Sequence, residues 1–75
     1  MSFYPYFGMP QHRYSFACYG LAHVKSRDFP TREAAVEHMY EVCARNGLRV
    51  NDVWDDRHDK TYCCDDGVKF YISRI

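Results

Sequence analysis

The sequence predicts one small α+β domain, in which an antiparallel sheet is covered on one face by a single helix. Three observations lead to this prediction: a helical segment with capping residues at both ends, strand-like segments on either side of it, and an Asp-Gly pair typical of hairpin turns. The expected element order is βαβββ. A chain of 75 residues buries only about 60% of its unfolded surface, so it has little room for a deep catalytic cleft.

Residues 1–12 are expected to form an arm in front of the domain of residues 13–75. Two prolines and a glycine interrupt regular structure there, while four aromatic side chains favour packing, either on the domain's own sheet or on a partner. Residues 13–25 then alternate with the period of a strand. A connection through residues 26–30 is expected to follow.

The helix is predicted over residues 32–46. Thr31 is a good N-cap, and Glu33 places a carboxylate near the positive end of the helix dipole. Gly47 suits the left-handed conformation that commonly follows a helix. The apolar side chains of the segment form one broad stripe that we expect to face the sheet, namely Ala35, Val36, Met39, Tyr40, Val42 and Cys43.

Three strands are expected after the helix, at residues 48–54, 60–65 and 68–74. Asp66-Gly67 predicts a two-residue type I′ turn, which places Asp65 opposite Val68 and fixes the register of the last two strands. The residues expected on the helix side are Thr61, Cys63, Val68, Phe70 and Ile72. Those expected on the outer face are Tyr62, Cys64, Lys69 and Tyr71.

Charge is unevenly distributed along a chain whose formal net charge is zero. Residues 51–67 contain six Asp against Arg57 and Lys60, and an acidic surface suits a partner protein with a basic surface. Exposed Trp and Tyr are typical interface anchors. The predicted partner-binding set is therefore Asp52, Trp54, Asp55, Asp56, Asp59, Tyr62, Asp65, Asp66 and Tyr71. Solvated turns and a divalent-cation site are the alternatives for these aspartates, although the run lacks the ligand spacing and the glycine of a calcium loop.

The alternative function is a small nucleic-acid-binding module. Its cations are Arg13, Lys25, Arg27 and Lys69. The outer tyrosines of the sheet supply rings on which bases stack, as in single-strand binding platforms. The zero net charge weighs against this function. A homodimer through the outer sheet face is the other use that the sequence leaves open for these rings.

No arrangement of residues indicates an enzyme, a cofactor or a bound metal. The four Cys lack a C-x-x-C spacing, and no nucleophile stands at a meaningful spacing from a His. Cys63 and Cys64 are expected on opposite faces of a strand, with Cys64 the exposed thiol. Without a secretory signal pattern, and with no segment near the ~20 apolar residues of a membrane span, we expect a soluble cytoplasmic protein with reduced thiols and no membrane partner.

The segment TREAAVEHMYEVCARNGLRVNDVWDDRHDKTYCCDDGVKFYISRI, from Thr31 to Ile75, resembles the short orphan proteins encoded by bacteriophages and prophages. These include anti-CRISPR proteins and other inhibitors of host defence. The resemblance lies in small size, single-domain organisation and aromatic density, and it assigns no functional residue. It implies a stoichiometric inhibitor that binds a host protein, often through an acidic surface that competes with nucleic acid.

Overall fold

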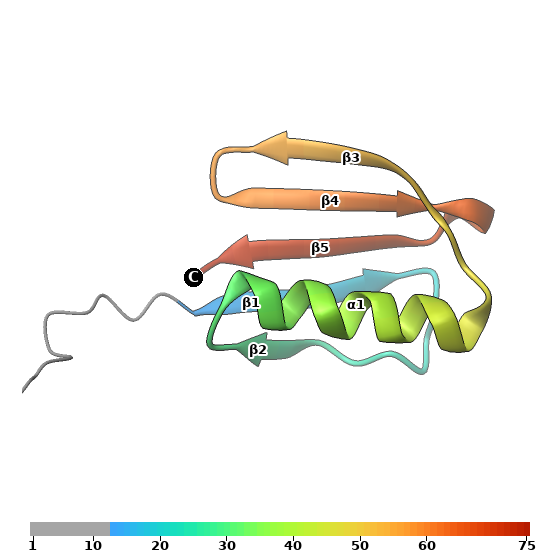
Figure 1. The fold of residues 1–75 in the computed structure, drawn as a ribbon, viewed down its shortest axis with the longest axis horizontal. Coiled ribbons are helices and arrows are strands. Elements are labelled where there is room, and N and C mark those ends of the chain that lie inside the picture. The colour runs from blue at the N-terminus through green and yellow to red at the C-terminus, as the bar shows by residue number, and fades with distance from the viewer. Residues whose placement is uncertain (1–12) are drawn as a thin grey trace, which may run out of the picture.

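The computed structural model describes residues 13–75, which contain one α-helix and a five-stranded antiparallel sheet. In chain order the elements are β1 (Tyr14–Tyr19), β2 (Arg27–Phe29), α1 (Arg32–Asn46), β3 (Val50–Asp56), β4 (Asp59–Cys64), the short 3₁₀ turn η1 (Asp65–Gly67) and β5 (Lys69–Arg74) (Figure 1). The predicted α+β class, with one helix on an antiparallel sheet, is confirmed. The predicted arm of residues 1–12 lies outside the described residues.

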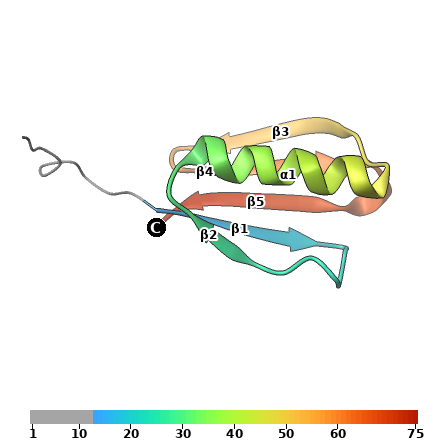
Figure 2. The same cartoon turned by 60° about the horizontal axis from the view of Figure 1, so that its bottom comes forward.

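The strands lie side by side in the order β2-β1-β5-β4-β3, so the last strand in sequence occupies the middle of the sheet. Pairing of β5 with β1 joins the first two strands to the later β3-β4-β5 meander. The helix lies across one face and contacts β1, β2 and β5, while β3 runs along the far edge (Figures 1 and 2). Within residues 13–75, no element covers the other face of the sheet.

The helix and both of its caps are confirmed. The Thr31 hydroxyl accepts a hydrogen bond from the Ala34 amide at 3.1 Å. Gly47 adopts the left-handed conformation with φ 66°, and its amide donates to the Cys43 carbonyl. Four residues of the predicted stripe are buried, namely Ala35, Met39, Val42 and Cys43. Tyr40 is 52% exposed, so its predicted place in the core is wrong, because the helix leaves the β3 side of the sheet uncovered.

The predicted connection through residues 26–30 is wrong in part, because it contains a strand. Arg27–Phe29 forms β2, which pairs antiparallel with β1. The Phe29 side chain is buried, and its ring meets that of Phe16 edge-on at a centroid distance of 6.2 Å. Pro30 follows and has no amide hydrogen with which to continue the ladder. The observed order is therefore ββαβββ, and β1 ends at Tyr19, earlier than predicted.

The turn between β4 and β5 is one residue longer than predicted. Asp66 and Gly67 both have positive φ, 64° and 75°, as the predicted turn type requires. Asp65 nevertheless joins the loop, and the Cys64 amide donates to the Val68 carbonyl at 2.8 Å. The loop thus has three residues, and the predicted register is wrong by one position.

This slip turns every side chain of β4 to the opposite face of the sheet. Tyr62 pairs with Phe70 instead of Tyr71, and Tyr62 and Cys64 are buried on the helix side. Thr61 lies on the outer face instead. The Tyr side chain has more apolar surface to remove from water than Thr, which favours the observed register.

The core lies between α1 and the sheet. Its fully buried large side chains are Phe16, Met39, Phe70 and Ile72, and the remaining members are Phe29, Ala35, Val42, Cys43, Tyr62, Cys64 and Val68. Among the described residues, no helix is both long and apolar enough to cross a membrane.

Candidate protein-binding face

Strand register determines which side chains share the uncovered side of the sheet, because directly paired residues point to the same face. We call this surface the open face. Its members are Ser15, Ala17, Tyr19, Asp28, Asp52, Trp54, Asp56, Asp59, Thr61, Cys63, Lys69, Tyr71 and Ser73. Three of its aromatic side chains are exposed: Trp54 by 60%, Tyr71 by 38% and Tyr19 by 64%.

Trp54 stands on the edge strand β3 and is held in a defined orientation. Its indole Nε1 donates a hydrogen bond to Asp52 Oδ2 at 2.7 Å. The other carboxylate oxygen, Oδ1, accepts the Val53 amide at 2.9 Å, which fixes the carboxylate itself. Lys69 Nζ lies 5.8 Å from the centroid of the indole ring, within cation–π distance. An exposed Trp that is already ordered loses little conformational freedom on binding.

Two aspartates face each other beside Trp54. Asp56 and Asp59 are paired directly across the β3-β4 hairpin, and both are exposed. Like charges in this arrangement oppose strand pairing. Within the open face they add to Asp28 and Asp52, against Lys69 as the single cation. The open face therefore combines exposed aromatic rings with a negative balance of charge.

The predicted partner-binding set divides between several surfaces. Trp54, Asp52, Asp56, Asp59 and Tyr71 lie together on the open face. The remaining members, Asp55, Tyr62, Asp65 and Asp66, do not. The register turns Asp55 to the helix side, where its Oδ2 lies 3.7 Å from Lys60 Nζ.

Tyr62 belongs to the core, where burial raises the pKa of its phenol. The other two aspartates lie in η1 at one end of the sheet. There Asp65 Oδ1 accepts a hydrogen bond from Asn51 Nδ2 at 2.8 Å.

The cations of the nucleic-acid alternative are separated as well. Lys69 lies on the open face, and Arg13 immediately precedes β1. Arg27 points to the helix side, with its guanidinium 4.8 Å from the Phe29 ring centroid, and it lines a cavity together with Lys25. The four side chains do not form a continuous basic track.

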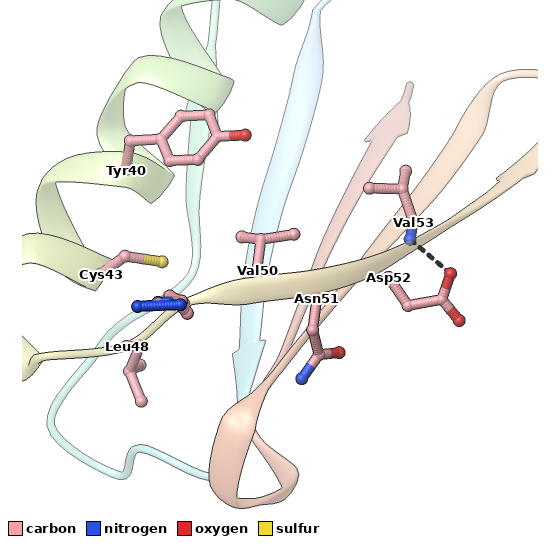
Figure 3. Close-up of a pocket in the computed structure, with 8 residues that line it drawn as sticks. Tyr40, Cys43, Leu48, Val50, Asn51, Asp52 and Val53 are labelled. Carbon is pink, nitrogen blue, oxygen red and sulfur yellow. Dashed lines mark hydrogen bonds between the residues drawn. The ribbon is translucent and has the colours of Figure 1, made fainter.

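A second partly apolar surface lies between α1 and β3. Figure 3 shows Tyr40 extending from the helix toward the space above β3, where Val50 and Val53 stand on the strand. Tyr40 and Val53 are exposed by 52% and 44%. This groove exists because the helix packs on β1, β2 and β5 and stops short of the edge strand.

Burial raises the thiol pKa of Cys18, Cys43 and Cys64, so these three cysteines are poor nucleophiles. Cys18, Cys43, Cys63 and Cys64 are all free thiols. Cys64 is buried, and its predicted exposure is wrong because of the register shift. Burial, with Cys43 close by, raises the pKa of the Cys64 thiol to about 12, so the thiol stays protonated. No group of three His, Cys, Asp or Glu side chains within residues 13–75 has the geometry to hold a metal ion.

One open-face aromatic was absent from the predicted set. Tyr19 is the last residue of β1 and pairs with Lys69 on β5. Its alternation with the buried Phe16 and the half-buried Cys18 could have indicated its face on β1. The strand order, which puts that face on the same side of the sheet as Trp54, could not be read from the sequence.

Comparison of the chain with known protein families, with curated proteins and with solved structures finds no match.

Proposed function

We propose that this protein is a non-enzymatic binding module whose open face engages a basic surface or segment of a partner protein. The observation that carries the proposal is the pre-oriented, exposed Trp54 with Asp52 and the facing pair Asp56 and Asp59 on the same surface. Trp and Tyr are the residue types that most often dominate binding energy at protein interfaces. The aspartates supply charge complementarity.

Arginine is the partner side chain that this chemistry suits best. A guanidinium stacks on an aromatic face and forms bidentate bonds with a carboxylate. Asp52 and Asp56 flank Trp54 two residues away on either side along β3 and point to the same face. An arginine could therefore stack on the indole and bond to a carboxylate at the same site. In the inhibitor version of the proposal, which follows from the resemblance to phage proteins, the bound surface is a nucleic-acid-binding surface of a host protein. That version places the protein in the reducing cytoplasm.

A homodimer through the open face is disfavoured by its charge. Two copies would bring Asp52, Asp56 and Asp59 against the same residues or against each other, at a cost that opposes self-association. Sedimentation equilibrium at low salt should therefore report a monomer. A dimer that Trp54→Ala disrupts would show that the open face binds a second copy, and would contradict the assignment of this surface to a basic partner.

Affinity capture from nuclease-treated bacterial lysate tests the proposal. The tagged protein should retain one stoichiometric protein, and Asp56→Lys should release it. Asp55→Lys is the matched control, because the adjacent residue carries the same charge but points to the helix side. Equal loss with both variants would indicate long-range charge rather than the open face, and retention of the partner by Asp56→Lys would refute the proposal.

Single-stranded nucleic acid is the second candidate, and one observation favours it: Lys69 lies over Trp54, a pairing of a cation with a stacking ring. The surplus of aspartate on the same face opposes it. A titration with single- and double-stranded oligonucleotides at rising salt separates the two functions. Phosphate binding must weaken steeply with salt, whereas a stacked aromatic anchor in a protein interface depends on it less.

A further inference from the structure

A small cavity lies on the helix side of the sheet, away from the open face, between the β1–β2 connection and the C-terminal half of α1. Its volume is about 300 Å³. Five basic side chains line it, namely His23, Lys25, Arg27, His38 and Arg45. No Asp or Glu is among its lining residues. Within residues 13–75, no carboxylate lies within salt-bridge distance of its Lys or Arg side chains.

Two of these groups are held in place by aromatic packing. The Arg27 guanidinium lies 4.8 Å from the centroid of the Phe29 ring. The His38 ring lies 4.9 Å from the Phe16 centroid and 5.2 Å from the Phe29 centroid. Because Phe16 and Phe29 belong to the core, their rings position the half-buried imidazole, and the exposed Arg27 guanidinium lies against the Phe29 ring. These two donors are therefore oriented before a ligand binds, which favours a small-ligand site.

The local field is positive despite the nearby end of the helix. The C-terminus of a helix carries about half a negative charge, which disfavours an anion there. The cavity places three full positive charges, those of Lys25, Arg27 and Arg45, against it. The Glu41 charge, which acts on His38, and the helix terminus together oppose these charges by about one and a half units, so the sum still favours an anionic ligand.

We infer that this cavity binds a small phosphate monoester. Guanidinium and imidazole groups match the several oxygens of a phosphate, and Arg forms paired hydrogen bonds with them. The partly apolar wall, which includes Val24 and Val42, provides contact for the organic part of the ligand. A volume of about 300 Å³ corresponds to the lower end of small-molecule sites. A phosphodiester strand fits less well, because Arg13 and Lys69 do not extend the cavity into a basic track.

His38 provides a direct spectroscopic readout. Burial lowers the pKa of its imidazole, the Arg27 and Arg45 charges lower it further, and Glu41 opposes them. His23 and Lys25 face the same cavity. A bound anion favours the charged imidazolium, so occupancy should raise the His38 pKa. A ligand that binds elsewhere leaves this value unchanged.

The experiment is a titration of the intact protein followed by the His38 ring resonances in NMR spectra. The probes are inorganic phosphate and adenosine 5′-monophosphate, with adenosine and an oligonucleotide lacking terminal phosphate for comparison. We expect saturable shifts and a raised His38 pKa with both phosphates, and neither effect with adenosine. Absence of saturation, or tighter binding of the oligonucleotide than of the monophosphate, would overturn the inference.

Substitution locates the site. Arg27→Gln combined with Arg45→Gln should weaken binding of the monophosphate at least about tenfold, because two charge-assisted contacts are lost. Arg49→Gln, which removes one positive charge from an exposed residue outside the cavity, should leave affinity within about twofold. Trp54→Ala should also have no effect, since the two surfaces are separate. Unchanged affinity in the double variant would refute the site.

Discussion

The two faces of the sheet differ sharply although the same strands supply both. Along β5, Phe70 and Ile72 are fully buried beneath α1, whereas the intervening Tyr71 is 38% exposed on the open face. The covered face contains apolar side chains and neutral thiols, while the open face contains aromatic rings with aspartates. Burial of the covered face stabilises the fold, whereas the exposed aromatic rings of the open face bury little surface and contribute little to stability. This difference is the reason for assigning binding to the open face.

The largest expected effect is on the covered face. Phe70→Ala should lower the free energy of unfolding by about 3–5 kcal/mol, because it removes a fully buried ring and leaves a cavity. Tyr71→Ala, one position along the same strand, should lower it by about 1 kcal/mol or less. Urea denaturation of the two variants measures both values. Similar losses at the two positions would show that the open face is covered in solution.

The next largest effect is on partner binding by the open face. Trp54→Ala should weaken capture of the partner by about 2 kcal/mol or more, which corresponds to about thirtyfold. Its thermal unfolding should change little, since the side chain is 60% exposed. Val53→Ala, on the helix side of the same strand, is the matched control and should bind normally. An equal loss in the control would point to the groove beside α1 instead.

A smaller effect is expected at the facing aspartates, where one substitution should raise stability and weaken partner binding. Asp59→Asn removes one of two like charges paired across the hairpin, and should raise the free energy of unfolding by about 0.2–1 kcal/mol. The same variant should bind the partner less well, because it also removes charge from the interface. Chemical denaturation and partner capture test the two parts separately. A variant that is less stable would mean that Asp59 has a favourable structural contact.

The smallest expected effect is a pH dependence of the free energy of unfolding, caused by His38 on the covered face. The folded His38 has a pKa below its ordinary 6.5, chiefly because burial disfavours the charged ring. At pH values between the ordinary pKa and the lower folded pKa, the unfolded chain binds more protons than the folded protein. Stability should therefore fall as the pH decreases through 6.5 toward the folded pKa. Unfolding in phosphate-free buffers from neutral to weakly acidic pH should show this decline. His38→Gln should flatten it, and an unchanged profile would exclude His38 as its source.

The helix and its surroundings were predictable because their signals are local. Thr31 and Gly47 cap the helix through bonds to residues only three or four positions away, so the sequence specifies both ends. Three members of the predicted binding set, Asp52, Trp54 and Asp56, could also be placed on one face from the sequence, since they alternate within one strand. Phe29 was missed because a three-residue strand is too short to show a period.

The assignment of β4 to its faces could not be made from local pattern. Both the two-residue and the three-residue turn satisfy the positive φ of Asp66 and Gly67, and they differ by one residue in register. Long-range packing decides between them, because only one register buries Tyr62 against the helix side of the sheet. The same register places Cys63 on the open face and buries Cys64, which is the reverse of the prediction.

By itself, the sequence determined the fold class, the capped helix, the composition of β3 and the uneven distribution of charge, because each depends on neighbouring residues or on simple counts. Only the tertiary structure decided which aspartates accompany Trp54, that Tyr19 shares their face, and that basic residues from a loop and the helix line one cavity. Those relations join residues far apart in the chain. They depend on strand order and register, which are set by the total burial that the whole fold achieves.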